Sequence, residues 1–167
     1  MVFYLLKEFM KEGFFMSVES VKNFFIERGL EDPVFNLEEC GATVELAAKT
    51  IGVEPALIAK TLSFRLKERD ILIVTKGDAR IDNKKYKDFF KIKAKMLDID
   101  EVVKITGHPV GGVCPFGLMN PIDVCIDVTL NEYEYVYPAA GSKYTALKIQ
   151  PSKMQELTKA EFIDVCK

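Results

Sequence analysis

The chain has few of the residues from which metal centres and thiol enzymes are built. Its four cysteines, Cys40, Cys114, Cys125 and Cys166, are widely spaced, contain no Cys-x-x-Cys pair and do not cluster with the single histidine, His108. This spacing argues against a structural zinc site and predicts free thiols in a reducing cytoplasm. Cys114 is the exception, because His108 precedes it by only six positions and could serve as its base.

An excess of charge of either sign is also missing. The 167 residues include 23 Lys and Arg against 25 Asp and Glu, which gives a formal net charge of −2. Contact with a nucleic acid would therefore have to come from a local basic patch. Lysines do gather at 84–87 and 91–95. From these residues alone, we favour a solvated helix face followed by an edge strand, where the lysines would prevent pairing with another strand.

Long uncharged apolar runs are absent. Residues 1–15 are apolar but include four charged side chains, so this stretch is too short and too charged to span a membrane. It also lacks the small-residue cleavage site of a signal peptide. Because Lys11-Glu12-Gly13 can be encoded by a purine-rich ribosome-binding sequence, we expect Met16 to be the native start and 1–15 to be an extension. The alternative is an amphipathic helix that packs on the domain or on a partner.

The composition is otherwise that of a soluble globular protein, with 49% hydrophobic and 29% charged residues. We expect one domain over residues 16–167, large enough for a real core. The strand-like segments outnumber the helices in the second half. This pattern predicts an α/β (α+β) fold with a mixed, largely antiparallel, β-barrel-like sheet and peripheral helices. Helices are predicted from an N-cap at Ser17 to Gly29, at 43–52, from Pro55, at 82–90, at 98–107 and from an N-cap at Ser152; strands are predicted at 34–37, 60–66, 71–75, 92–95, 123–128, 133–137, 145–149 and 162–165.

Three short strings carry most of the functional information: 58–62, 111–117 and 139–142. In the first, Lys60 lies among apolar neighbours and must either extend to solvent or meet an anion. The second is a glycine-rich loop whose backbone N–H groups can face a ligand. Together they predict a site made from one cation and main-chain donors, suited to binding and hydrolysing an activated anionic ester. Taken singly, each string is also typical of a helix-end lysine or a tight turn.

In their order and spacing these strings resemble the YbaK/prolyl-tRNA synthetase-associated domain family. The resemblance extends from about Ser17 to Lys167. It rests on four matches: Lys60-Thr61-Leu62, the stretch Ile81-Asp82-Asn83-Lys84-Lys85 that opens a helix, the Gly-x-x-x-Pro loop from Gly111 to Pro115, and the turn Ala139–Ser142.

This resemblance implies an editing domain with a β-barrel-like mixed sheet. Such proteins hydrolyse the ester that joins a wrongly attached amino acid to the 3′ end of a tRNA, often cysteine or alanine on tRNA-Pro. We therefore expect a deacylase acting in trans, with the tRNA acceptor end as its partner, prolyl-tRNA synthetase as a further partner, and neither a cofactor nor a metal. Water or a group of the substrate would be the attacking species.

The resemblance also assigns roles to residues. Lys60 would hold the terminal adenosine or its phosphate, while Gly111 and Gly112 would supply backbone donors to the developing oxyanion. The remaining substrate-binding residues would be Thr61, His108, Val113, Cys114, Pro115, Phe116, Gly141 and Ser142, and the tRNA-binding lysines would be Lys84, Lys85 and Lys87.

Some positions depart from better-known relatives. Cys114 replaces a small hydroxyl residue, residues 38–43 lack pocket-shaping aromatics, and the strand after Ser142 lacks an acidic residue. These departures affect the predicted amino-acid specificity more than the fold. Two alternatives stay open: a non-catalytic module that binds a tRNA end or nucleotide, and a thiol enzyme that uses Cys114 with His108.

Overall fold

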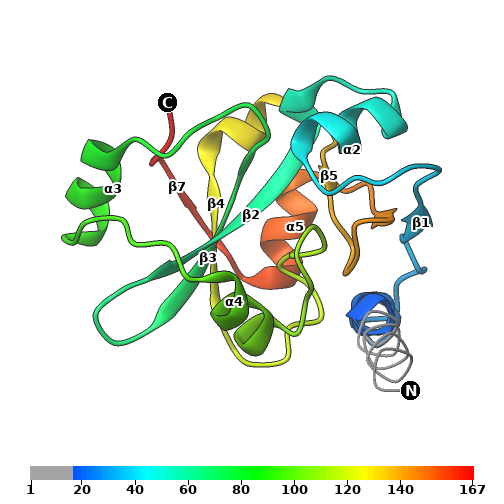
Figure 1. The fold of residues 1–167 in the computed structure, drawn as a ribbon, viewed down its shortest axis with the longest axis horizontal. Coiled ribbons are helices and arrows are strands. Elements are labelled where there is room, and N and C mark those ends of the chain that lie inside the picture. Colours follow the sequence, from blue (N-terminus) through cyan, green and yellow to red (C-terminus); the bar gives the residue numbers. More distant parts are fainter. Residues whose placement is uncertain (1–16) are drawn as a thin grey trace, which may run out of the picture.

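The computed structural model describes residues 17–167 (Figure 1). The expected extension at 1–15 and the expected start at Met16 lie outside these residues. In the described part of the chain, no helix is both long enough and apolar enough to cross a membrane.

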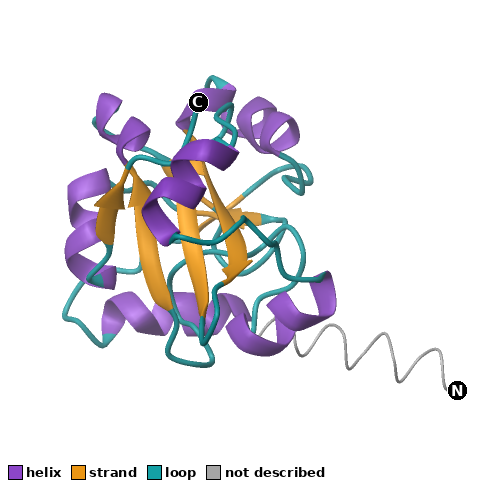
Figure 2. Ribbon diagram, turned by 90° about the vertical axis from the view of Figure 1, so that its left-hand side faces the viewer, coloured by secondary structure: helices purple, strands orange, loops and turns teal. Residues whose placement is uncertain are grey.

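The centre of the fold is a five-stranded sheet with the order β5-β2-β3-β4-β7 (Figures 1 and 2). β2 and β3 form the antiparallel hairpin predicted from two apolar runs and a charged turn, whereas β2/β5, β3/β4 and β4/β7 are parallel pairs. The expectation of a largely antiparallel sheet is therefore wrong, because helices and long loops connect the later strands and return them in the parallel sense. The order ends at β5 and β7, so these five strands form an open sheet and no barrel. The bounds are β2 Ile58–Arg65, β3 Asp70–Lys76, β4 Asp123–Asp127, β5 Tyr137–Pro138 and β7 Glu161–Ile163.

The segments expected at 133–137 and 145–149 form strands of only two residues. β1 (Phe35–Asn36) pairs with β6 (Thr145–Ala146) in a small antiparallel sheet. Isolated bridges between Val136 and Ile149 and between Ala139 and Ala146 continue the pairing beyond these short strands. The segment expected to be a strand at 92–95 is irregular, with a single bridge from Met96 to Phe64.

Helix boundaries agree more closely with the sequence. The Thr43 and Asp82 side chains cap their helices, and Asp98 forms a capping box with Glu101. Two expected caps are wrong: Ser17 is already helical, and the last helix begins at Pro151, whose missing N–H costs nothing in the first turn. The helices are 17–26, α2 Val44–Ile51, the 3₁₀ turn η1 Pro55–Leu57, α3 Asn83–Phe90, α4 Ile99–Thr106, the 3₁₀ turn η2 Val128–Glu132 and α5 Pro151–Thr158.

Helices surround the sheet (Figure 2). Apolar side chains cover both of its faces. On one face, Leu72 and Val74 pack in a large cluster with residues of helix 17–26, the loop around Phe116 and α5. On the other face, Phe64 and Ile73 pack with Tyr86 of α3. Alternation along β2 therefore directs Lys60 and Leu62 to the α3 face and Thr61 and Ser63 to the opposite face.

Candidate functional site

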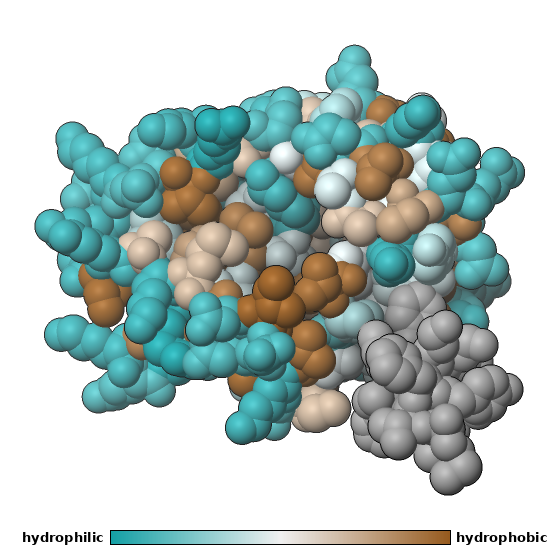
Figure 3. Space-filling model, viewed as in Figure 1, coloured by the Kyte–Doolittle hydropathy of each residue, from teal (hydrophilic) through white to brown (hydrophobic). Residues whose placement is uncertain are grey.

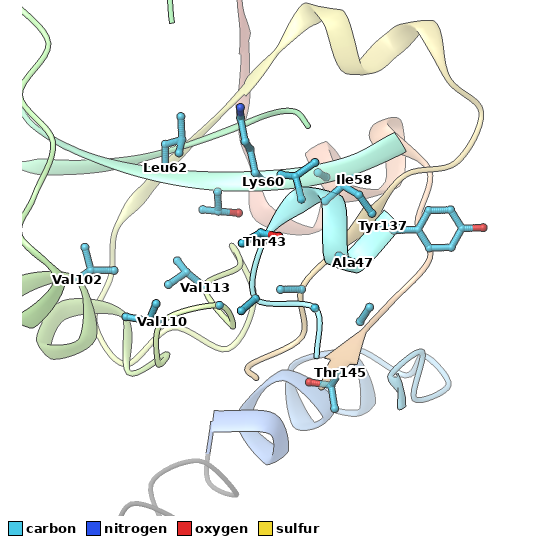
Figure 4. A pocket seen from close by; sticks show the side chains of 18 of the residues that line it. Thr43, Ala47, Ile58, Lys60, Leu62, Val102, Val110, Val113, Tyr137 and Thr145 are labelled. Atoms are coloured by element: carbon cyan, nitrogen blue, oxygen red, sulfur yellow. The ribbon is translucent and has the colours of Figure 1, made fainter. Parts of the chain in front are cut away.

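A cavity of about 340 Å³ lies along β2 where α2, α4 and the glycine loop approach it (Figure 4). Its walls come from segments far apart in the sequence, which is why no single string of residues defines it. The lining residues used below are Gly41, Ala42, Thr43, Ala47, Lys60, Thr61, Met96, Ile99, Val103, Val110, Gly111, Val113 and Ala139.

The wall of this cavity is mostly apolar. Gly41, Ala42, Ala47 and Ala139 contribute only small groups to it, and the larger apolar side chains include valines from α4 and the glycine loop. No carboxylate, thiol or imidazole of residues 17–167 lines the cavity. A reaction there would have to rely on backbone donors, hydroxyl groups and water.

Large apolar side chains stay exposed at the mouth of the cavity. Met96 is 57% exposed, Ile99 63% and Val110 56%. Figure 3 shows an apolar group near the middle of this face, over α4. Exposed apolar groups that adjoin a cavity are typical of a binding surface.

The glycine loop turns at Gly111. The Gly112 N–H donates to Pro109 O at 2.9 Å, and Gly111 has φ of +81°, so residues 109–112 form a turn of the type that requires a left-handed third residue. The N–H groups of Gly111 and Val113 bond to no atom of residues 17–167. Both residues line the cavity, so the two unbonded backbone donors belong to its wall.

Close packing holds this loop in place. A Cβ atom on Gly111 would lie 3.0 Å from Lys143 Cβ and 3.2 Å from Ala42 Cα. A Cβ on Gly112 would overlap the backbone N of Ser142, and the Gly112 carbonyl accepts a hydrogen bond from Gly141 N at 3.0 Å. The two glycines are therefore needed both for backbone conformation and for contact with the turn at 139–142.

Lys60 lines the cavity with part of its side chain, but its amine points to the other side of β2 from Val110 and Val113 (Figure 4). Nζ donates to Gly77 O at 3.1 Å and to Ala79 O at 2.5 Å. Burial lowers the pKa of this amine, and nearby Cys166 and Asp78 oppose that shift. As the structure stands, Lys60 ties β2 to the turn after β3.

Thr61 points to the face opposite Lys60. Its Oγ1 is buried and has no hydrogen-bond partner among residues 17–167. Because Thr61 also lines the cavity, this hydroxyl is a further polar group within the site.

His108 and Cys114 do come together, but beneath the loop. His108 Nε2 lies 2.7 Å from Phe116 O and 3.6 Å from Cys114 Sγ, while Ser17 Oγ lies 2.6 Å from Nδ1. A carbonyl can only accept, so Nε2 carries the proton and Nδ1 accepts from Ser17. Burial lowers the pKa of His108 and raises that of Cys114 to about 12. Both groups are therefore neutral and buried, and neither lines the cavity.

The other predicted substrate-binding residues have structural contacts. Phe116 is fully buried against Phe24 and Phe25, and Pro115 is buried beside them. A Cβ on Gly141 would lie 2.7 Å from Ser17 O, so this turn packs on helix 17–26. Ser142 is fully buried and does not line the cavity.

The three predicted tRNA-binding lysines lie on α3 and differ in their contacts. Lys84 and Lys87 are exposed. Lys85 donates to Asp164 Oδ1 at 2.8 Å and to Cys166 O at 2.9 Å, and the bond to Asp164 raises its pKa. Lys85 thus fastens α3 to the C-terminal segment, while its two neighbours extend into solvent.

Comparison with known proteins shows the family of this chain. Residues 38–157 match the aminoacyl-tRNA editing domain. The chain belongs to this family. It is 47% identical to the uncharacterized protein YwhH of Bacillus subtilis (strain 168), over 91% of this chain and 98% of that one.

Two further likenesses connect the family to prolyl-tRNA synthetase. Proline–tRNA ligase of Caldicellulosiruptor bescii is 26% identical over 81% of this chain, which spans only 25% of the ligase. A crystal structure described as a candidate trans-editing enzyme for prolyl-tRNA synthetase superposes with a TM-score of 0.82 at 27% identity, covering 90% of this chain and 97% of that one. The editing-domain resemblance expected from the four sequence strings is confirmed.

Sequence reasoning missed much of the cavity wall in this editing domain. Thr43 was expected only as a helix cap, and Ile99, Val103 and Val110 carried no expected role. Their apolar character is the usual signature of a core, so a sequence gives no reason to place them at a cavity mouth. The one available signal was the run of small residues at 41–42, which allows the glycine loop to approach closely.

Proposed function

We propose that this protein is a trans-acting aminoacyl-tRNA deacylase that hydrolyses mischarged tRNA, with Cys- or Ala-tRNA(Pro) as its substrates. The observation that carries the proposal is the apolar cavity lined by Gly111 and Val113, two residues whose N–H groups have no partner among residues 17–167. Family membership and the likeness to the synthetase domain support it.

In this proposal the amino-acid side chain enters the cavity and the ester carbonyl meets the Gly111 and Val113 amides. Backbone donors held in place before the reaction stabilise the oxyanion that forms when water attacks the ester. Such donors contribute about 3–4 kcal/mol each when well aligned. The predicted donor Gly112 differs from its neighbours, since its N–H is already bonded to Pro109 O.

Small or apolar aminoacyl groups suit this cavity best. Its lining offers no charged partner for an acidic side chain, and burying an unpaired carboxylate is costly. Cysteine and alanine can both be accommodated without such a partner. The exposed apolar side chains at the mouth would contact the terminal nucleoside.

In this proposal Lys60 binds the tRNA end, and this requires its amine to change hydrogen-bond partners. Its amine must leave the Gly77 and Ala79 carbonyls to reach a substrate in the cavity. A role that only ties β2 to the neighbouring turn is the alternative, and the Lys60 variant discussed below separates the two.

The test is a panel of mischarged tRNAs incubated with the purified protein, with release of the amino acid followed over time. We expect release of cysteine or alanine from tRNA-Pro and none of correctly attached proline. Binding of uncharged tRNA without any ester hydrolysis would instead identify a non-catalytic module of the same fold.

A further inference from the structure

A lysine with no predicted role lies beside the glycine loop. Lys143 is exposed, and its Cβ is the nearest atom to the place that a Cβ on Gly111 would occupy, at 3.0 Å. Its carbonyl accepts a hydrogen bond from Gly41 N at 2.7 Å. Lys143 therefore contacts two segments, at 41–42 and at 111, that both line the cavity.

The backbone that carries Lys143 is rigid. Tyr144 N donates to Ser142 Oγ at 3.0 Å, Ser142 Oγ lies 2.8 Å from Thr145 Oγ1, and Thr145 Oγ1 donates to Ala140 O at 2.9 Å. Since the Thr145 proton is used on Ala140 O, the Ser142 hydroxyl donates to Thr145. This buried chain of hydrogen bonds fixes the turn. The Cβ of Lys143 therefore has a defined position beside Gly111.

The charge of Lys143 is available to a ligand. Lys143 makes no ion pair with any of residues 17–167. Its Nζ lies 5.6 Å from the centroid of the Tyr144 ring. Lys60, in contrast, is bonded to two carbonyls on the other side of β2. Lys143 is thus an exposed lysine whose Cβ packs beside Gly111, a residue with an unbonded amide.

We propose that Lys143 binds the phosphodiester of the 3′-terminal nucleotide of the tRNA. The inference rests on the proposed deacylase function, which places the ester at Gly111 and Val113. The nearest anion of the substrate then lies one sugar away from the ester, outside the cavity. An exposed ammonium next to the loop attracts that phosphate, while the apolar cavity accepts the uncharged part of the substrate.

The experiment compares two substrates that differ only in the phosphate. One is an aminoacylated short RNA that ends in CCA, and the other is the same amino acid esterified to adenosine with no 5′ phosphate. For the Lys143→Gln variant we expect kcat/KM on the RNA to fall about tenfold, as for one hydrogen bond to a charged group, and hydrolysis of the adenosine ester to stay unchanged. Lys143→Arg should restore most of the loss. Lys148→Gln, which removes another exposed lysine close by in the chain, is the matched control.

Equal losses on both substrates, or no loss on either, would overturn the phosphate assignment. Binding of the uncharged CCA-ending RNA gives a second readout that needs no catalysis. There Lys143→Gln should weaken binding and reduce the salt slope by about 0.7, the value for one phosphate on a single strand. If the wild type hydrolyses neither ester but its RNA binding still depends on Lys143, the deacylase proposal fails and the phosphate site stands. An unchanged salt slope contradicts the phosphate site itself.

Discussion

Two pairs of residues in and beside the glycine loop contain groups of opposite character. Gly111 and Val113 have no reactive side chain, yet they line the cavity and their N–H groups have no partner among residues 17–167. His108 and Cys114 are the residue types most often associated with catalysis, yet they are buried and bonded to each other and to Phe116. In this part of the chain the groups without a partner are backbone amides, whereas the reactive side chains are bonded and hold the loop in place.

The strongest way to test this comparison is to change the backbone at Gly111. Gly111→Ala would place a Cβ against Ala42 and Lys143 and force an L-residue to φ of +81°. We expect deacylation to fall by about two to three decades, as when an oxyanion donor is displaced. The strained conformation should also cost about 1–3 kcal/mol of stability. Single-turnover deacylation and denaturant unfolding measure the two effects.

Gly52→Ala is the matched control for Gly111. Gly52 has φ of +83°, but a Cβ there meets no atom within 4 Å, so the variant has similar backbone strain at a residue that does not line the cavity. We expect a similar loss of stability with activity kept. If Gly52→Ala and Gly111→Ala lose activity equally, strain and not the loop's donors explains the result.

Lys60→Ala tests whether a cation on the other side of β2 takes part. If its amine holds the tRNA end, we expect deacylation to fall by about two decades. Loss of a charged donor to Gly77 O and Ala79 O should also lower the free energy of unfolding by about 1.5–3 kcal/mol. A folded variant that is less stable but fully active would show that Lys60 only ties the turn to β2.

Local signals predicted part of this fold well. Thr43 and Asp82 cap helices because their side chains bond to amides two or three residues ahead. A short stretch of sequence is therefore enough to predict such a cap. The parallel pairing of β4 with β3 and β7 depends on contacts between distant segments, which the sequence does not state. The same limit applies to Lys60: alternation separates it from Thr61, but only the packed structure reveals which face the glycine loop covers.

The lysines of α3 test the tRNA path outside the cavity. Lys84 and Lys87 are exposed, whereas Lys85 is held by Asp164 and Cys166 O. If the helix contacts phosphates, Lys84→Gln and Lys87→Gln together should lower the salt slope of tRNA binding by roughly two units. Lys85→Gln should change the slope less and loosen the C-terminal segment instead. A slope that stays the same in the double variant would place the tRNA elsewhere.

Cys114 should give the smallest effect on activity. Burial raises the pKa of its thiol to about 12, so almost no thiolate exists in the folded protein at pH 8. We expect Cys114→Ala to keep most deacylation and wild-type Cys114 to resist alkylation until the protein unfolds.

The raised pKa of Cys114 also affects stability. The contribution of Cys114 to the free energy of unfolding is complete below about pH 9 and is lost as pH rises toward 12, because only the unfolded thiol ionises in that range. Cys114→Ala should remove this part of the alkaline loss of stability.

His108→Ala should lower stability by leaving Phe116 O and Ser17 Oγ without their partner, while the folded fraction keeps its activity. If both variants are well folded and inactive, and alkylation at pH 8 inactivates the wild type, then His108 and Cys114 are the chemical groups and the backbone is only their support.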